Sequence, residues 1–166
     1  SPSGLAGPEQ SFGAVMSPAD IERTISDFAA AAAVAHRCGF DGIEIHAAHG
    51  YLPDQFFWHA TNLRSDRYGG SLSDRAAFTA DIIRACRLAT SESFAISVRI
   101  SQWKQLDYEA QVATTANELE TWLKPMVDAG ANIFHASTRK FWQPAFTESD
   151  LSFSGWVRKL SGKPTI

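Results

Sequence analysis

Cysteine is scarce in this chain, which has 166 residues and only two cysteines, Cys38 and Cys86. Two lone thiols fit a reducing compartment better than a disulfide framework, and the stretch SPSGLAGPEQ lacks the charged and apolar segments of a signal peptide. We therefore expect a cytoplasmic protein in which both cysteines are small buried side chains. Long apolar runs are missing too. None approaches the roughly 18 residues that span a bilayer, so no membrane partner is expected.

Charge of either sign is modest, and several well-known motifs are missing. The chain has 15 Lys and Arg against 18 Asp and Glu, a net charge of −3 and a pI near 5.9. Without a basic stripe, no nucleic-acid partner is expected. No GxGxxG, CxxC or HExxH pattern occurs, which removes a separate dinucleotide fingerprint and weakens the case for zinc. The chain is still long enough for one domain with a hydrophobic core.

Helix and strand patterns alternate along the chain. Ser17 is a good N-cap for a first helix that should end at Gly39. Thr115 and Glu118 form a capping-box pattern for a later helix, in which Pro125 is expected to introduce a kink. The expected helices are residues 17–39, 71–89, 115–130 and 150–162, and the expected strands are residues 42–47, 94–101 and 132–137, with the start of another at 163–166.

This order predicts parallel βαβ units. The chain opens in a loop with no strand before its first helix and closes as its last strand begins. Such an arrangement suits a slice of a (β/α)8 barrel better than a complete doubly wound sheet. We expect residues 1–166 to be a single segment of a TIM-barrel domain, truncated at both ends, from about strand four to the start of strand seven. Unpaired strand edges would allow self-association into a homo-oligomer.

Polar residues collect where the expected strands end, which is where active sites of such barrels lie. His46 and His49 end the first strand, Arg99 ends the second, and His135 and Ser137 end the third. The loops that follow carry aromatic residues that could line or cover a planar ligand; the same side chains could equally serve loop packing or a protein contact. These aromatic residues are Trp103, Tyr108, Phe141 and Trp142.

The pair His46-x-x-His49 allows three interpretations. Both histidines could be structural. They could bind zinc, with Glu44, Asp54 or His59 as further ligands. Alternatively, they could donate hydrogen bonds to a substrate oxygen, with the phenol of Tyr51 nearby as a proton donor.

The stretch from His46 to Phe78 resembles the signature of the Old Yellow Enzyme family of flavin-dependent ene reductases. The family pattern is roughly H-x-x-[HN]-G-Y-L-x-x-Q-F, followed by N-x-R-x-D-x-Y-G-G-S-x-x-x-R. This chain supplies HAAHGYLPDQF, and then NLRSDRYGGSLSDR. It departs from the usual pattern before Asn62, where Trp58 and His59 stand near the place of a Ser-Pro pair.

The resemblance implies FMN as cofactor, NADH or NADPH as reductant, and a small α,β-unsaturated substrate such as an enone or a nitro-alkene. His46 and His49 would hold the substrate oxygen, Tyr51 would supply the proton, and Arg99 would face the N1/C2 edge of the flavin. Glu44, on the same side of its strand as His46, could pair with Arg99 instead. Trp103, Phe141 and Trp142 would shape the substrate pocket. The stretch from Asn62 to Arg75 would be structural, with Arg64, Asp66 and Arg75 in a salt-bridge network.

The flavin's phosphate site and its other contacts would lie on barrel units that these residues do not include. The chain alone is therefore expected to bind FMN weakly or not at all and to be inactive. The residues themselves are also compatible with two other functions. One is a metal-dependent hydrolase or lyase that uses His46, His49 and His135. The other is a non-catalytic barrel remnant that serves as a binding module.

Overall fold

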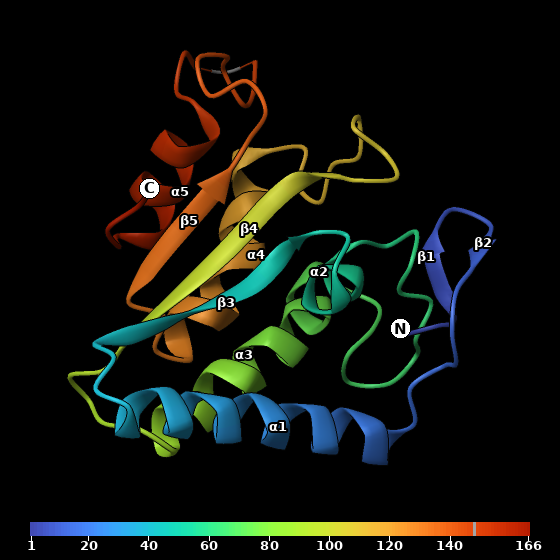
Figure 1. The fold of residues 1–166 in the computed structure, drawn as a ribbon. Helices are drawn as coiled ribbons and strands as arrows, with labels where there is room; N and C mark the ends of the chain where they lie inside the picture. Colours follow the sequence, from blue (N-terminus) through green and yellow to red (C-terminus); the bar gives the residue numbers. More distant parts are fainter. Residues whose placement is uncertain (148) are drawn as a thin grey trace.

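A parallel three-stranded sheet forms the centre of the computed structural model, which describes residues 1–147 and 149–166 (Figure 1). The strands run in the order β3-β4-β5, and each is followed along the chain by a helix that packs on the sheet or on a neighbouring helix. The elements are β1 (Leu5–Gly7), β2 (Gln10–Ser11), α1 (Pro18–Arg37), β3 (Gly42–His49), α2 (Leu52–Phe57), α3 (Leu72–Leu88), β4 (Ala95–Lys104), α4 (Ala116–Asp128), β5 (Ile133–Ser137) and α5 (Phe153–Ser161).

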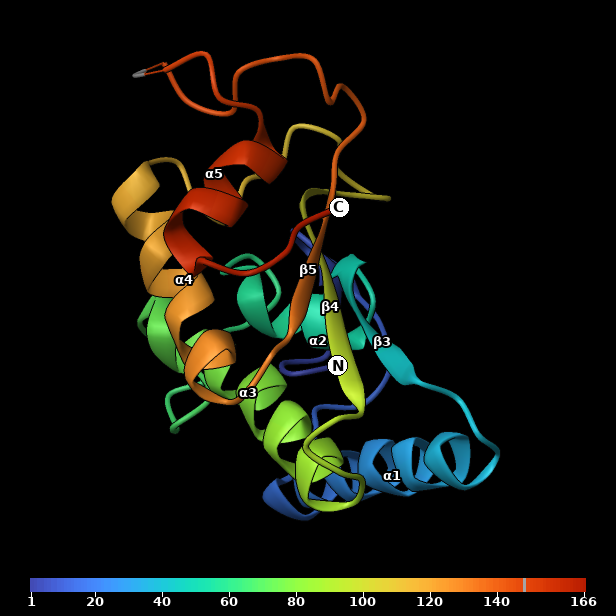
Figure 2. The same ribbon diagram turned by 90° about the vertical axis from the view of Figure 1, so that its left-hand side faces the viewer.

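The helices cover only one face of the sheet (Figure 2). That face is apolar: Ile45, Val98 and Phe134 lie in register across the three strands, and all three are buried. The opposite face carries polar side chains because successive residues of a strand point to opposite sides. His46, Arg99 and His135 form one such row. The sheet therefore separates a hydrophobic core from a polar surface.

The helix ends follow the sequence signals closely. Ser17 and Asp20 form a complete capping box at the start of α1, and Gly39 follows that helix with a φ of +85°. The Thr115 hydroxyl accepts from the Glu118 amide, as expected. The Glu118 carboxylate, however, accepts from the amide and hydroxyl of Thr114, so the second half of that box is displaced by one residue.

Some of the sequence-based predictions were wrong, and others were confirmed. The N-terminal segment is not a loop without strands, because β1 and β2 pair as an antiparallel hairpin. The short helix α2 was not predicted at all. Cys86 is buried as expected, whereas Cys38 is exposed. At the other end, Thr165 forms a parallel bridge with Phe134, as expected for a strand that begins beside β5.

Candidate functional site

The carboxyl ends of β3 and β4 place the first candidate residues together. The rings of His46 and His49 meet edge to face with centroids 5.2 Å apart, and the Tyr51 ring lies 4.8 Å from that of His46. The Tyr51 hydroxyl is also 3.3 Å from Nε2 of Gln105, which donates to it. The half-exposed phenol and two imidazoles therefore form one cluster, as the spacing predicted.

His49 holds an unusual backbone conformation. Its φ is +64°, in the left-handed region that non-glycine residues seldom adopt, and Gly50 follows with a φ of +88°. Neighbouring side chains hold this turn: the His49 amide donates to Ser101 Oγ at 2.9 Å, and the Gly50 amide donates to Asp54 Oδ2 at 2.6 Å. Such strain persists only where surrounding contacts enforce it, so the hydrogen bonds from these neighbours maintain the turn in its strained conformation.

Beneath the turn lies a buried ion pair that the sequence did not reveal. Lys104 Nζ donates to Asp54 Oδ1 at 2.8 Å and to the Ser101 carbonyl at 3.0 Å. Burial raises the pKa of Asp54 to about 6, against the opposing effect of the Lys104 charge, and burial lowers the pKa of Lys104. Asp54 thus links the ammonium group to the backbone of the strained turn.

Both site histidines are neutral near pH 7. Burial is the main cause that lowers the pKa of His49 to about 4, and the positive charge of Arg99 lowers it further. The same two causes, in the same order, lower the pKa of His46. Neutral imidazoles can each donate only one hydrogen bond, so the position of the ring proton matters.

Arg99 lies on the polar face, in register with His46 and His135. Its Nη2 donates a long 3.4 Å hydrogen bond to Ser137 Oγ, while its Nε is buried and has no partner among the residues that the structure describes. The alternative pairing with Glu44 is not found in that part of the chain. Glu44 instead contacts His135 Nδ1 at 3.2 Å and accepts from Ser97 Oγ at 3.0 Å.

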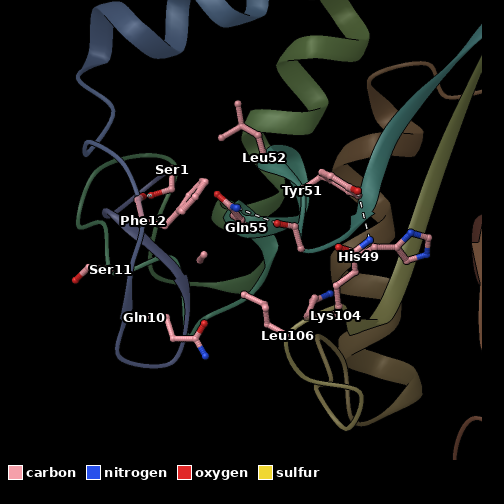
Figure 3. Close-up of a pocket in the computed structure, with 13 residues that line it drawn as sticks. Ser1, Gln10, Ser11, Phe12, His49, Tyr51, Leu52, Gln55, Lys104 and Leu106 are labelled. Carbon is pink, nitrogen blue, oxygen red and sulfur yellow. Dashed lines mark hydrogen bonds between the residues drawn. The ribbon is translucent and has the colours of Figure 1, made fainter.

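A cavity of about 630 Å³ opens between this turn and the N-terminal hairpin (Figure 3). Tyr51 and His49 lie on one side of it, and Phe12 and Gln10 of the hairpin segment face them from the other. The lining is Ser1, Ala6, Gln10, Ser11, Phe12, His49, Gly50, Tyr51, Leu52, Gln55, Lys104, Gln105 and Leu106. Sequence patterns gave no sign of this wall, because it depends on the hairpin that had been taken for a loop.

The three aromatic residues that were predicted to shape the substrate pocket lie in two different places. Trp103 stacks on the His49 ring, with centroids 4.3 Å apart and an interplanar angle of 25°. Phe141 and Trp142 contact each other edge to face, are 71% and 66% exposed, and do not line the cavity beside Tyr51. Trp103 lies within β4, not on the loop expected after that strand, and belongs to the histidine cluster, whereas the other two lie on the loop after β5.

The possible metal ligands do not converge. Within residues 1–147 and 149–166, no group of three or more His, Cys, Asp or Glu side chains is placed to hold a metal ion. Asp54 is engaged with Lys104 and the Gly50 amide, and His59 lies exposed.

The segment from Asn62 to Arg75 makes contacts that differ from the salt-bridge network expected there. Arg64 pairs with Asp66 and also donates to the Met16 carbonyl at 2.7 Å, which ties the segment to the N-terminal region. Arg75 forms no ion pair with an acidic side chain among the residues that the structure describes. It donates to the carbonyls of Phe57 at 2.8 Å and Gly70 at 2.6 Å.

The fold is a parallel α/β arrangement that carries polar side chains near the carboxyl ends of its strands. The chain belongs to the NADH:flavin oxidoreductase / NADH oxidase family, whose sequence model matches residues 3–166. This match confirms the resemblance to the Old Yellow Enzymes that the motif indicated. No described helix has the length and apolar character that crossing a membrane requires.

Individual relatives agree with this assignment. An NADH oxidase of Thermoanaerobacter brockii is 37% identical over 155 residues, which cover 89% of this chain and 23% of that protein. An NADPH dehydrogenase of Geobacillus thermodenitrificans is 32% identical over 154 residues, which cover 90% of this chain and 43% of the relative. The chain thus spans less than half the length of both. A structure of morphinone reductase in complex with tetrahydroNAD shares the fold with a TM-score of 0.71 at 22% identity, over 94% of this chain and 40% of the other.

Proposed function

We propose that this chain is part of a (β/α)8-barrel oxidoreductase that uses FMN and reduces activated C=C bonds, such as those of enones and nitro-alkenes, with NADH or NADPH as reductant. The observation that carries the proposal is the cluster of His46, His49 and Tyr51 at the end of β3, beside Arg99. Family membership supports the flavin and the nicotinamide. The names of the relatives include both NADH-linked and NADPH-linked enzymes, so either reductant is consistent with the proposal.

Arg99 is the residue in this chain that would hold the flavin. Its positive charge stands on the polar sheet face, and its buried Nε lacks a partner within the described residues. An electron-rich ring edge would satisfy that donor, so the residue fits the group. FMN, when bound, supplies the hydride; the other roles belong to side chains of the protein.

His46 and His49 would bind the oxygen of the substrate's carbonyl or nitro group through their ring N–H donors. Neutral rings suit this role, because they can polarise the oxygen without transferring a full charge to it. Tyr51 would donate the proton of its hydroxyl to the carbon alpha to that group. Its phenol is partly exposed, lines the cavity and adjoins His46, which supports access to a ligand on that side.

Trp103 would fix the plane of His49 by stacking, and Phe141 and Trp142 would contribute to substrate selection from the loop after β5. The cavity beside Tyr51 suggests that the N-terminal hairpin shapes the entrance, since Phe12 faces the turn across it.

Tyr51→Phe in the FMN-loaded enzyme that carries this segment tests the proposal. Loss of the phenolic proton should slow reduction of 2-cyclohexenone by at least about a hundredfold, the usual scale of a general acid. Reduction of the flavin by NADPH should be unchanged, because no proton from Tyr51 is needed for it. Equal enone turnover in both proteins would contradict the role of Tyr51, and absence of any flavin-dependent turnover would contradict the proposed function.

A further inference from the structure

One hydroxyl group, that of Ser137 at the end of β5, lies between Arg99 and His49. Its Oγ is 2.8 Å from His49 Nε2, and Arg99 Nη2 donates to the same oxygen at 3.4 Å. The family motif does not include Ser137, which lies 88 residues away from His49 in sequence. The contact arises because β3 and β5 flank β4 in a parallel sheet, so that the carboxyl ends of all three strands lie at the same edge.

The chemistry of these groups fixes the direction of the Arg99 hydrogen bond and favours one direction for the contact with His49. A guanidinium group can only donate, so the Ser137 oxygen accepts from Arg99. The single hydrogen of the hydroxyl then needs an acceptor, and His49 Nε2 is the one that lies within reach among the described residues. Donation from Ser137 makes Nε2 an acceptor, which places the ring proton of a neutral His49 on Nδ1.

The surroundings of the ring preserve this arrangement. The His49 ring stacks on Trp103, and the left-handed backbone of His49 is held by Ser101. Burial lowers the pKa of His49 to about 4, so the ring carries a single N–H proton near pH 7. Since Nε2 is engaged with Ser137, Nδ1–H is the donor that the ring can offer to a ligand.

We propose that Ser137 is a positioning residue that holds the neutral His49 ring with its proton on Nδ1, so that the ring presents one N–H donor to the substrate oxygen. The identity of the acceptor as a substrate oxygen rests on the proposed function, whereas the tautomer does not. Ser137 acts through His49 and needs no contact with substrate. Arg99 orients the hydroxyl, which links the proposed flavin contact to the proposed oxygen contact.

The test is a long-range ¹H–¹⁵N correlation spectrum of the ¹⁵N-labelled 166-residue chain at pH 7, which reports the protonated nitrogen of each imidazole. We expect His49 to show a protonated Nδ1 and an unprotonated Nε2. A wild-type spectrum with the proton on Nε2 would overturn the proposal without the need for any variant.

Substitutions then separate positioning from general packing. Ser137→Ala should shift the His49 population toward the Nε2–H tautomer, and Ser137→Thr, which keeps a hydroxyl and suits a strand, should restore the wild-type spectrum. Ser97→Ala is the matched control, since its hydroxyl lies on the same face but donates to Glu44. An unchanged tautomer in Ser137→Ala, or an equal change in Ser97→Ala, would contradict the proposal.

Catalytic turnover distinguishes this inference from the proposed function. If His49 carries its proton on Nδ1 while the FMN-loaded enzyme fails to reduce an enone, Ser137 positions the ring and the proposed function is wrong. If the enzyme reduces the enone while His49 carries its proton on Nε2, the proposed function stands and the role of Ser137 is overturned.

Discussion

Lys104 Nζ lies 2.8 Å from Asp54 Oδ1, and both side chains are almost completely removed from solvent, with 1% and 0% of their area exposed. The pair joins the end of β4 to the first turn of α2, and Asp54 also accepts from the amide of Gly50. Two buried charges are costly to desolvate, so such a pair is weak evidence for stability by itself. Here it fixes the strained turn that carries His49 and Tyr51.

Removal of one partner of this buried ion pair should strongly lower the free energy of unfolding. Lys104→Met leaves the Asp54 carboxylate buried without its cation, and we expect a loss of about 3–5 kcal/mol in the free energy of unfolding. Urea denaturation followed by circular dichroism measures it. Lys124→Met is the matched control, because Lys124 pairs with Asp128 at the same 2.8 Å on the exposed surface of α4 and should cost no more than about 0.5 kcal/mol. Equal losses in the two variants would show that burial of the pair is unimportant.

The pH dependence of stability should carry a contribution from His49. Its pKa is lowered from 6.5 to about 4 on folding, so the folded chain binds fewer protons than the unfolded chain between these values. The contribution of His49 is therefore complete above pH 6.5 and is lost as the pH falls toward 4. His49→Asn removes the titration and tolerates a positive φ. In urea unfolding at pH 7 and pH 4.5, this variant should lose less stability on acidification than the wild type. An equal loss of stability on acidification in His49→Asn and in the wild type would argue against the assignment.

The charge of Arg99 should be measurable at both histidines. It lowers the pKa of His46 and of His49, second to burial in each case. Arg99→Gln should therefore raise both pKa values, while that of His49 stays below 6.5 because its burial remains. NMR titration of the imidazole protons gives the values directly. Lys124→Gln, an equal change of charge on the exposed face of α4, should leave both histidines unaffected. Unaltered pKa values in Arg99→Gln would mean that its guanidinium does not act on the cluster.

The alternation of helices and strands was predictable because each signal is local. Ser17, Gly39 and the apolar stripes act within a few residues of their own position. The βα order correctly placed His46 and Arg99 on neighbouring strands, but neither residue ends its strand, because β3 continues to His49 and β4 to Lys104. The Lys104–Asp54 pair and the Ser137–His49 contact were not predictable. They join residues 50 and 88 positions apart, and no local pattern encodes which side chains the register of β3, β4 and β5 brings together.

The N-terminal hairpin shows a different limit. Its strands contain only three and two residues, too few for an alternating pattern to be visible. The hairpin is nevertheless important for the candidate site, because Phe12 and Gln10 close the cavity opposite Tyr51. Because this segment was predicted to be a loop, one wall of the pocket was not predicted from the sequence.

The paired glycines of the YGGS segment should respond differently to alanine. A Cβ on Gly69 would lie 2.0 Å from the Arg64 carbonyl oxygen, so Gly69→Ala must displace backbone, and we expect a loss of about 3 kcal/mol or more in the free energy of unfolding. Gly70 faces open space but has a φ of +83°, so Gly70→Ala should cost only about 1–2 kcal/mol of backbone strain. Thermal and urea unfolding of the two variants make the comparison. If Gly70→Ala were the more damaging change, the close approach of Arg64 to Gly69 would not be the reason for glycine at this turn.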